Sequence, residues 1–366
     1  MISEEIYFAI KEEKIIGRYV VNDQIISFMK RFESLYNVET IGYSVQKRPI
    51  MGITLGQGPT KILMWSQMHG NESTTTKAVL DLLNWFLSST VASSAVLDNC
   101  TLKIIPILNP DGAEAYTRFN ANYVDLNRDA QELSQPESKV LREVFEDFKP
   151  NFCFNLHDQR TIYNVGCSDK PATVSFLAPS LDAVRSISQN RGVAMQVIVA
   201  MNQVLQQMIP GQVGRYDDGY NANCVGDAFQ MLKTPTILFE AGHFGHDYER
   251  ESTRKFLFYA LLTAVNSIAD KSYEMYSKDG YFNIPENQKQ FFDILVKNAH
   301  LINNTLSTDI GILYTEVLRE GSIHFEPNIE SAGNLEGYFG HEIFDCMNEK
   351  DLGSLKSSDY WKLLAP

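Results

Sequence analysis

Apolar runs typical of buried strands alternate with helix-like stretches along the first 270 residues, and this alternation limits the folds open to the chain. The strand-like runs lie at 61–66, 101–108, 152–157 and 235–240. The helical patterns lie at 24–35, 74–89, 137–148, 181–208 and 249–269. Such alternation predicts an α/β fold, with a largely parallel sheet and helices on both of its faces.

The pattern changes after about residue 275. A helical stretch is predicted from Asn287 to Leu301, and strand-like runs follow at 312–318 and 322–326. We therefore expect a large domain over residues 1–274 and a small C-terminal α+β extension over residues 275–366. Three roles are open to the extension: packing on the large domain, covering a sheet edge, or making a dimer contact.

Two potential metal ligands lie in a loop between a predicted strand and a predicted helix. His69 and Glu72 are three residues apart, and His157 ends the apolar run 152–156. In open α/β sheets ligands gather at the carboxyl ends of the strands, where all three residues are expected. Two histidines and one carboxylate leave a fourth metal position open for water, as in catalytic zinc sites. This trio therefore predicts a hydrolytic metal site.

Five motifs follow one another in a fixed order, and together they resemble the M14 zinc carboxypeptidases. They are HGNE at 69–72, NPDG at 109–112, Arg118, DLNR at 125–128, and Glu240 at the end of the run 236–239. The resemblance covers roughly residues 40–270, and the ordered set is far more specific than any one motif. It implies a three-layer α/β/α fold with a mainly parallel mixed central sheet.

The resemblance also implies a cofactor and a site. One zinc ion per chain is bound by His69, Glu72 and His157. The residues that act on the substrate are Arg118, which polarises the scissile carbonyl, Asn127 and Arg128, which hold the terminal carboxylate, and Glu240, which is the general base. These roles suit the groups, because a guanidinium pairs with a carboxylate in bidentate fashion and a Glu beside the metal can move a proton.

The chain departs from the family pattern in two places. The segment between Gly112 and Val124 is short, which predicts a reduced rim around the site. Asp129 follows Arg128 where the family usually has Asn. A carboxylate there would repel the substrate's carboxylate unless Asp129 is paired or turned away.

A mobile Tyr closes over the substrate in this family, and two residues fit that role here. Tyr216 and Tyr220 both lie in a segment rich in Gly, Asp and Asn, which predicts a loop suited to a lid. Tyr220 is slightly preferred, and a plain surface turn is the alternative for each ring. The side chains of Cys224, Val225 and Met231 could line the pocket or belong to the core.

Other polar residues near the motifs are not counted as ligands. His243 and His246 are expected to line the pocket or cap a helix, with Asp247 as the N-cap of the helix that begins near Glu249. Asp158 and Arg160 follow His157 directly. They could support the ligands, contact substrate, or form a paired surface turn.

Composition agrees with a globular enzyme. Lys and Arg number 32 against 45 Asp and Glu, a net charge of −13, and the absence of a basic run argues against nucleic acid or anionic membrane as a partner. The first 14 residues lack a basic start and an apolar stretch, so a cytoplasmic location is expected. Five scattered cysteines predict reduced thiols.

Three functions remain for the whole chain. The leading hypothesis is a zinc-dependent metallocarboxypeptidase that removes a C-terminal amino acid from a peptide. The nearest rival is a zinc-dependent amidase or deacylase acting on N-acyl amino acids or cell-wall peptides. A third is a non-catalytic protein that binds peptide carboxylates, although such a protein has no need of a base at Glu240. The oligomeric state is left open, with a homo-oligomer among the alternatives.

Overall fold

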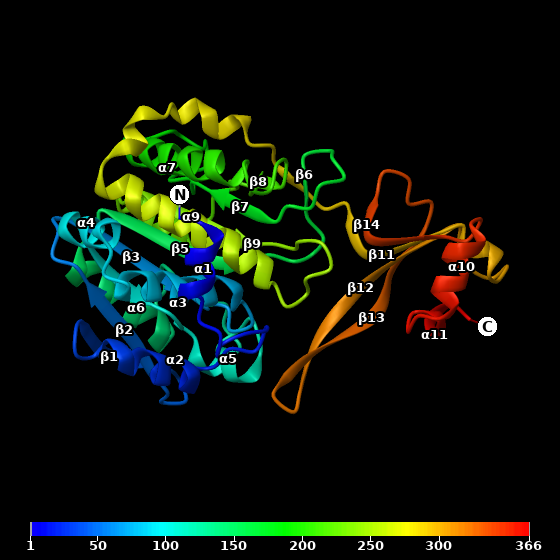
Figure 1. Ribbon diagram of the computed structural model, residues 1–366, viewed down its shortest axis with the longest axis horizontal. Coiled ribbons are helices and arrows are strands. Elements are labelled where there is room, and N and C mark those ends of the chain that lie inside the picture. The colour runs from blue at the N-terminus through cyan, green and yellow to red at the C-terminus, as the bar shows by residue number, and fades with distance from the viewer. Residues whose placement is uncertain (1, 366) are drawn as a thin grey trace.

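An eight-stranded mixed sheet forms the centre of the large part of the molecule in the computed structural model, which describes residues 2–365 (Figure 1). In spatial order its strands are β1 (Asn37–Tyr43), β2 (Pro49–Leu55), β4 (Cys100–Ile105), β3 (Thr60–Ser66), β5 (Phe152–Asp158), β9 (Thr236–Ala241), β7 (Val174–Leu177) and β8 (Val213–Arg215). The four middle strands β4, β3, β5 and β9 run parallel to one another. Their carboxyl ends therefore share one edge of the sheet.

Helices cover both faces of this sheet. One layer contains α1 (Glu4–Ile10), α2 (Asn22–Met29), α3 (Thr74–Leu87), α4 (Val91–Asn99), α7 (Gln189–Leu205) and α9 (Glu251–Ala269). The opposite layer contains α6 (Pro136–Phe148) and α8 (Val225–Met231). Successive strand residues point to opposite faces, so Ile62 and Met64 pack in the first layer while Leu63 and Trp65 pack in the second. The predicted three-layer α/β/α fold is confirmed.

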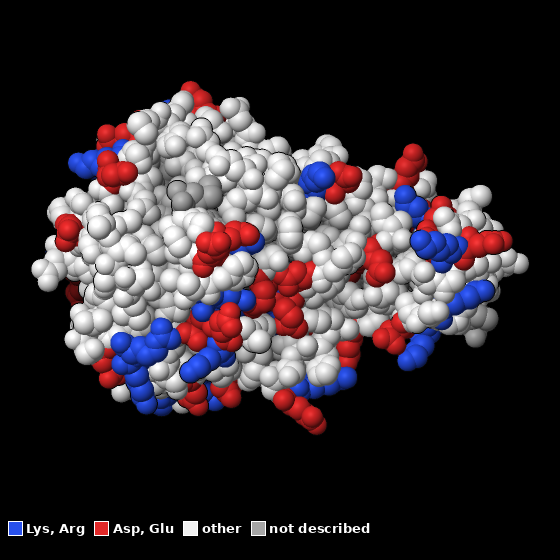
Figure 2. All heavy atoms as spheres, viewed as in Figure 1, with Lys and Arg blue, Asp and Glu red and all other residues white. Residues whose placement is uncertain are grey.

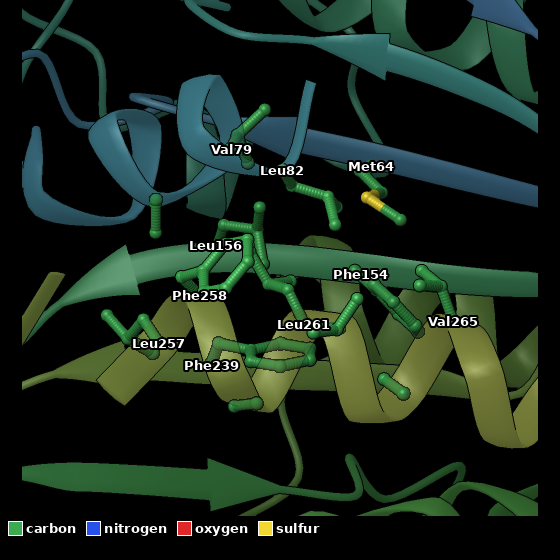
Figure 3. Packing of buried hydrophobic residues seen from close by; sticks show 14 of the residues in the cluster. Met64, Val79, Leu82, Phe154, Leu156, Phe239, Leu257, Phe258, Leu261 and Val265 are labelled. Carbon is green, nitrogen blue, oxygen red and sulfur yellow. The ribbon is translucent and has the colours of Figure 1, made fainter. Parts of the chain in front are cut away.

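The larger of the two helical layers holds the main core (Figure 3). Met64, Phe154 and Phe239 on neighbouring strands contact a layer that includes Leu82 of α3 and Leu261 of α9. Each of these side chains is almost fully buried, which stabilises the fold by about 1.5–3 kcal/mol per side chain. This core fixes the strand ends that carry the site.

Most elements lie where the sequence predicts them, with one displaced helix start. Helix α7 begins at Gln189, because the hydroxyl of Ser188 accepts a hydrogen bond from the backbone N–H of Arg191 and caps the helix there. The helix predicted to begin at residue 181 is therefore wrong over its first residues. The four outer strands β1, β2, β7 and β8 were not predicted.

A second, four-stranded sheet forms the C-terminal part. Its spatial order is β13 (Ser322–Gly333), β12 (Asp309–Arg319), β11 (Phe291–Lys297) and β14 (Phe339–Asp345), followed in the chain by α10 (Glu349–Lys356) and α11 (Trp361–Leu364). The helix predicted over 287–301 is wrong, since this stretch contains β10 (Asn287–Gln288) and β11. Ile294 and Leu295 pack in different clusters on the two faces of β11, and an apolar run buried on both sides does not distinguish a strand from a helix.

The C-terminal sheet packs on the large part, which is one of the three roles considered for it. The 3₁₀ helices η3 (Ser272–Met275) and η4 (Lys278–Asn283) precede the sheet, and Tyr281 is buried in the core of the large part. The packing therefore sets the boundary after Ile284 rather than at residue 274. The hairpin β12–β13 returns to the large part, where Glu316 pairs with Arg18 at 3.0 Å (Figure 1).

The surface seen in Figure 2 carries acidic and basic side chains interspersed, and acidic side chains gather near the boundary between the two parts. All five cysteines are free thiols, as predicted. Among residues 2–365 no single helix is long and apolar enough to cross a membrane, and the pair α3 and α4 meets that criterion only jointly, across a bend of 104°.

Candidate active site

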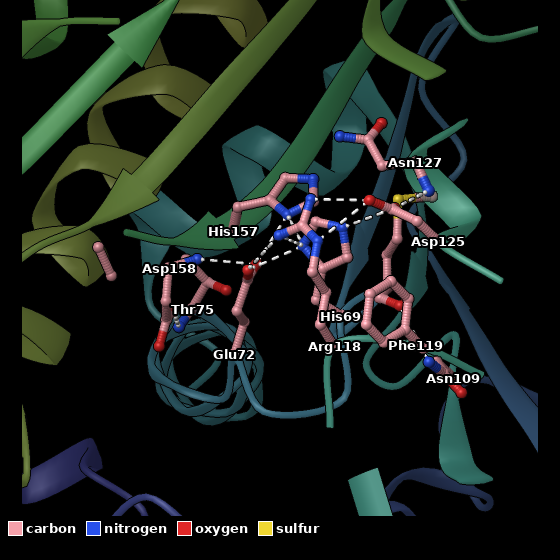
Figure 4. A network of polar contacts seen from close by, with 12 residues as sticks. His69, Glu72, Thr75, Asn109, Arg118, Phe119, Asp125, Asn127, His157 and Asp158 are labelled. Carbon is pink, nitrogen blue, oxygen red and sulfur yellow. Dashed lines mark hydrogen bonds and ion pairs between the residues drawn. The ribbon is translucent and has the colours of Figure 1, made fainter. Parts of the chain in front are cut away.

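Three side chains converge at the carboxyl edge of the central sheet (Figure 4). His69 Nδ1 lies 2.8 Å from Glu72 Oε1, and His157 Nδ1 lies 2.8 Å from Glu72 Oε2. The two Nδ1 atoms are 3.1 Å apart. Within residues 2–365 these three residues are the one group of His, Cys, Asp or Glu found suitable for a metal ion.

A strand end and a tight loop position these ligands. His69 and Glu72 lie between β3 and α3, and His157 lies at the end of β5, next to β3 in the sheet. Gly70 is required in the loop, because a Cβ atom there would lie 1.9 Å from the backbone carbon of Gly112. The NPDG and HGNE segments therefore pack backbone against backbone.

The donor atoms fit a metal ion. Asp125 Oδ1 accepts a hydrogen bond from the Nε2–H of His69 at 3.1 Å, which leaves the Nδ1 lone pair directed at the centre of the group. The two imidazole nitrogens and the carboxylate lie close enough together for their donor atoms to bind one cation. An N₂O donor set with one side open matches a catalytic zinc site.

Charges around the group favour a cation as well. Burial disfavours the ionised form of Glu72, yet His69 and His157 outweigh it and hold the pKa of this carboxyl below its usual range. Burial lowers the pKa of His157, which favours the neutral form that binds a metal. In this structure the guanidinium of Arg118 approaches the group, with Nη1 donating to His69 Nδ1 at 3.2 Å.

Glu240 lies beside the ligands. It is the partner of His157 on the adjacent parallel strands β9 and β5. Its Oε2 atom is buried and has no hydrogen-bond partner among the described residues. Burial, followed by the charges of Glu72 and Asp158, raises its pKa well above the ordinary value. A raised pKa makes a carboxyl group a stronger base, which suits it to accept a proton during a reaction.

Asp125 is a site residue to which the sequence analysis assigned no role. One carboxylate oxygen contacts His69, and the other accepts a hydrogen bond from Arg118 Nε at 3.0 Å. This carboxylate therefore orients both a ligand and the cation that faces it. Its position in the DLNR motif, two residues before Asn127, was the available signal.

A cavity of about 420 Å³ opens in front of these residues, and we call it the active-site cavity. Asn127 and Arg128 line it, together with Arg118 and Glu240. Asn127 Oδ1 accepts the backbone N–H of Val225 at 3.0 Å, which fixes the amide. The guanidinium of Arg128 is exposed and lies beside it, so a cationic end of the cavity is available to a carboxylate.

Asp129 is turned away from the cavity. Its Oδ1 accepts hydrogen bonds from the backbone N–H and the hydroxyl of Ser134, and its Oδ2 accepts the N–H of Gln135. The repulsion considered from the sequence is therefore avoided, because this carboxylate orders the turn before α6.

The tyrosine that the structure brings to the cavity is Tyr216. Strand β8 ends at Arg215, so Tyr216 follows directly from the sheet and lines the cavity, with its hydroxyl 2.9 Å from that of Tyr163. Tyr220 is not among the lining residues, and its hydroxyl contacts Met231 Sδ at 3.1 Å. Tyr216 therefore lines the cavity in this structure and Tyr220 does not, while the role of either ring as a lid over the substrate stays a prediction.

Further residues divide between the cavity and the scaffold. Cys224 and Asp227 line the cavity, whereas Val225 packs in the core and Met231 is exposed. Asp227 was not predicted, and burial raises its pKa to about 7.

The residues that follow His157 and Glu240 in the chain are also placed. Asp158 accepts the backbone N–H groups of Thr74 and Thr75 at the start of α3, while Arg160 is exposed at the cavity mouth. His243 is buried against Tyr248 and is not part of the metal group.

Comparisons with known proteins show what this chain is similar to in sequence and in fold. Residues 21–129 match the model of the Peptidase_M14 family, described as zinc carboxypeptidase. Carboxypeptidase SOL1 of Arabidopsis thaliana is 29% identical over 178 residues, which cover 42% of this chain and 36% of the relative. Carboxypeptidase M of Mus musculus is 28% identical over 170 residues, 38% of each chain. The chain thus spans little more than a third of the length of these curated relatives.

A solved structure shares the fold. The metallo-carboxypeptidase from Burkholderia cenocepacia superposes with a TM-score of 0.56 at 18% identity and covers 69% of each chain. The family match includes the HGNE, NPDG and DLNR segments that build the site. The match to the zinc carboxypeptidase model covers residues 21–129, and the large part of the chain shares the fold of a metallo-carboxypeptidase.

Proposed function

We propose that this protein is a zinc-dependent carboxypeptidase that hydrolyses the C-terminal peptide bond of its substrate. The observation that carries the proposal is the position of Glu240, a buried carboxyl group with an unpartnered oxygen, on the strand next to His157. A protein that only binds carboxylates has no use for such a group. The donor set of His69, Glu72 and His157 supports the choice of zinc.

The residues of the chain supply binding, orientation and proton transfer. Asn127 and Arg128 would hold the terminal carboxylate, because a charged fork and an ordered amide lie together at one end of the cavity. The guanidinium of Arg118 would donate hydrogen bonds to the oxygen of the scissile carbonyl as negative charge develops there. When bound, zinc supplies a Lewis acid for the carbonyl and for the attacking water.

Glu240 would move the proton. Its carboxylate takes a proton from the attacking water and gives it to the nitrogen of the leaving amino acid, so the C–N bond breaks without release of an unprotonated amine anion. The raised pKa of Glu240 suits both halves of this transfer. Asp125 would keep His69 and Arg118 in their orientations throughout.

The proposal is tested by metal content and by the need for a free C-terminus. Purified protein reconstituted with zinc is assayed by elemental analysis and against matched peptides that carry either a free carboxylate or an amide at the C-terminus. About one zinc per chain, lost in His69→Ala, and cleavage of only the free-carboxylate peptides are expected. Cleavage of N-acyl amino acids with inertness toward peptides would favour the amidase or deacylase instead.

A further inference from the structure

A second cavity, of about 300 Å³, lies where the C-terminal sheet meets the large part of the molecule. Arg18 and Arg250 line it from the large part, and Tyr314, Glu316 and Phe325 line it from the hairpin β12–β13. We call it the interdomain cavity. Figure 1 shows this hairpin running from the C-terminal sheet toward the large part.

The interdomain cavity adjoins the active-site cavity. Glu72, Asp158, Gln159 and Arg160 line both cavities. Arg128, at the cationic end proposed for the terminal carboxylate, lines only the active-site cavity. A substrate that binds there and crosses the metal ligands would therefore place its acyl side in the interdomain cavity.

The carboxylates of the interdomain cavity already have partners. Asp158 accepts two backbone N–H groups of α3, at 3.0 and 3.3 Å. Asp293 accepts the hydroxyl of Tyr248 at 3.0 Å and the N–H of Tyr314 at 2.8 Å. These two carboxylates have little capacity left for a ligand's cation.

The remaining cavity carboxylates are also occupied. Glu316 pairs with Arg18 at 3.0 Å and accepts the hydroxyl of Tyr116 at 2.5 Å. Glu72 belongs to the metal group. The acceptor groups of this cavity are therefore largely satisfied from within the protein.

The hydrogen-bond donors are satisfied only in part, although the terminal nitrogens of both buried arginines donate to protein acceptors. Arg18 and Arg250 are 5% and 2% exposed, and the Nε–H of each is buried without a partner among residues 2–365. Burial, followed by the charge of Arg18, lowers the pKa of Arg250, so the two buried cations oppose each other. Arg160 is exposed, and its guanidinium makes no ion pair or hydrogen bond within the described residues. Unpartnered donor groups on the two buried arginines, together with the exposed guanidinium of Arg160, favour a ligand that offers an anionic acceptor.

The walls of the cavity suit a short carbon chain that carries such an anion. Tyr248, Tyr314 and Phe325 line one side, with the rings of Tyr248 and Tyr314 in an edge contact of 5.0 Å. Apolar walls with a few charged groups are typical of sites that orient small ligands.

We propose that the interdomain cavity is a subsite for a carboxylate on the acyl side of the scissile bond. The preferred substrate then carries an acidic side chain on the residue that precedes the cleaved bond, or a dicarboxylic acyl group in the same place. The orientation of the substrate in this assignment rests on the proposed hydrolytic function. The preference of the cavity for an anion rests on the arginines alone. Arg160 is the specificity residue that can be changed with least risk to the fold, because it is exposed.

The first test compares substrates that differ by one charge. Zinc-loaded protein is assayed on N-acetyl-glutamyl-leucine and N-acetyl-glutaminyl-leucine, and on N-succinyl-leucine against its neutral succinamoyl analogue. We expect kcat/KM to favour the charged member of at least one pair by about tenfold or more, as for one charge-assisted hydrogen bond. A preference within the first pair would assign the carboxylate to an acidic side chain, and a preference within the second pair would assign it to a dicarboxylic acyl group. Equal values within both pairs would overturn the assignment.

Two variants test whether the preference arises in this cavity. Arg160→Gln removes a cation that lines it, and the ratio of charged to neutral substrate should fall toward one. Arg319→Gln removes an exposed cation at the end of β12, outside the cavity lining, and should leave the ratio as it is in the unaltered protein. An equal fall in both variants would assign the preference to the overall charge and overturn the subsite.

Binding separates this inference from the proposed function. Calorimetric titration of zinc-loaded Glu240→Gln with the same pairs measures the dissociation constants without turnover. Tighter binding of the charged member, lost with Arg160→Gln in that background, would support the subsite even if no peptide were cleaved by the unaltered protein. Turnover of peptides with no discrimination in either measurement would leave the hydrolase standing and remove the subsite.

Discussion

His157 and Glu240 occupy partner positions on the parallel strands β5 and β9, so a metal ligand and the group proposed as the base are held by one ladder of backbone hydrogen bonds. Neither side chain depends on a flexible loop for its position. Catalytic groups carried by rigid strands are located more accurately than groups on loops. The same relationship explains the raised pKa of Glu240, because the strand end that positions this carboxyl group is buried.

The first prediction concerns this carboxyl group. Glu240→Gln keeps the shape of the side chain but cannot accept a proton, so kcat should fall by about 10²- to 10⁴-fold. Zinc content should stay near one per chain, because Glu240 is not a member of the metal group. Glu336→Gln, at an exposed position of the C-terminal part, is the matched control and should retain full activity. Near-normal turnover in Glu240→Gln would assign the base to another residue.

The convergence of the three candidate metal ligands with Glu240 could be anticipated from the sequence for a physical reason. His69, His157 and Glu240 each follow or end an apolar run, and parallel strands bring their carboxyl ends to one edge of a sheet. The position of a residue at the end of an apolar run therefore predicts its position in the folded protein.

Other parts of the site could not be read in this way. Tyr216 lines the active-site cavity because it directly follows β8, and β8 has only three residues, too few to be predicted from the sequence. The interdomain cavity depends on contacts such as that between Arg18 and Glu316, which are 298 residues apart. A periodic pattern of apolar residues does not indicate which face of the C-terminal sheet will pack against the large part of the molecule.

The second prediction concerns the support of the ligands. Asp125→Asn removes the charge that orients His69 and Arg118, and metal affinity should fall by about 10- to 100-fold. Competition between the protein and a chelator for zinc measures this change. Asp147→Asn, an exposed position on α6, is the control for the loss of one negative charge. Unchanged zinc affinity in Asp125→Asn would show that the carboxylate does not position His69.

The third prediction distinguishes the two tyrosines. Tyr216→Phe removes a hydroxyl that lies in the active-site cavity, and kcat/KM should fall by about tenfold, the value of one hydrogen bond near 1.4 kcal/mol. Tyr220→Phe should stay within about twofold of the unaltered protein, because that hydroxyl contacts Met231 outside the cavity lining. The reverse pattern would mean that the loop rearranges on substrate binding and brings Tyr220 inward.

The fourth prediction concerns pH and stability. Burial raises the pKa of Asp227 from 3.8 to about 7, so between these pH values the folded protein keeps a proton that the unfolded chain releases. The free energy of unfolding therefore loses a contribution from this group as pH rises through the window, and the loss is complete above the folded pKa. The Asp227→Asn variant has no ionisable group at this position. The difference in free energy of unfolding between the variant and the unaltered protein should therefore favour the variant more at pH 8.5 than at pH 5. Urea midpoints at the two pH values measure the difference, with the exposed Asp359→Asn as control. A margin that does not change between the two pH values would show that Asp227 is ionised in the folded protein throughout this range.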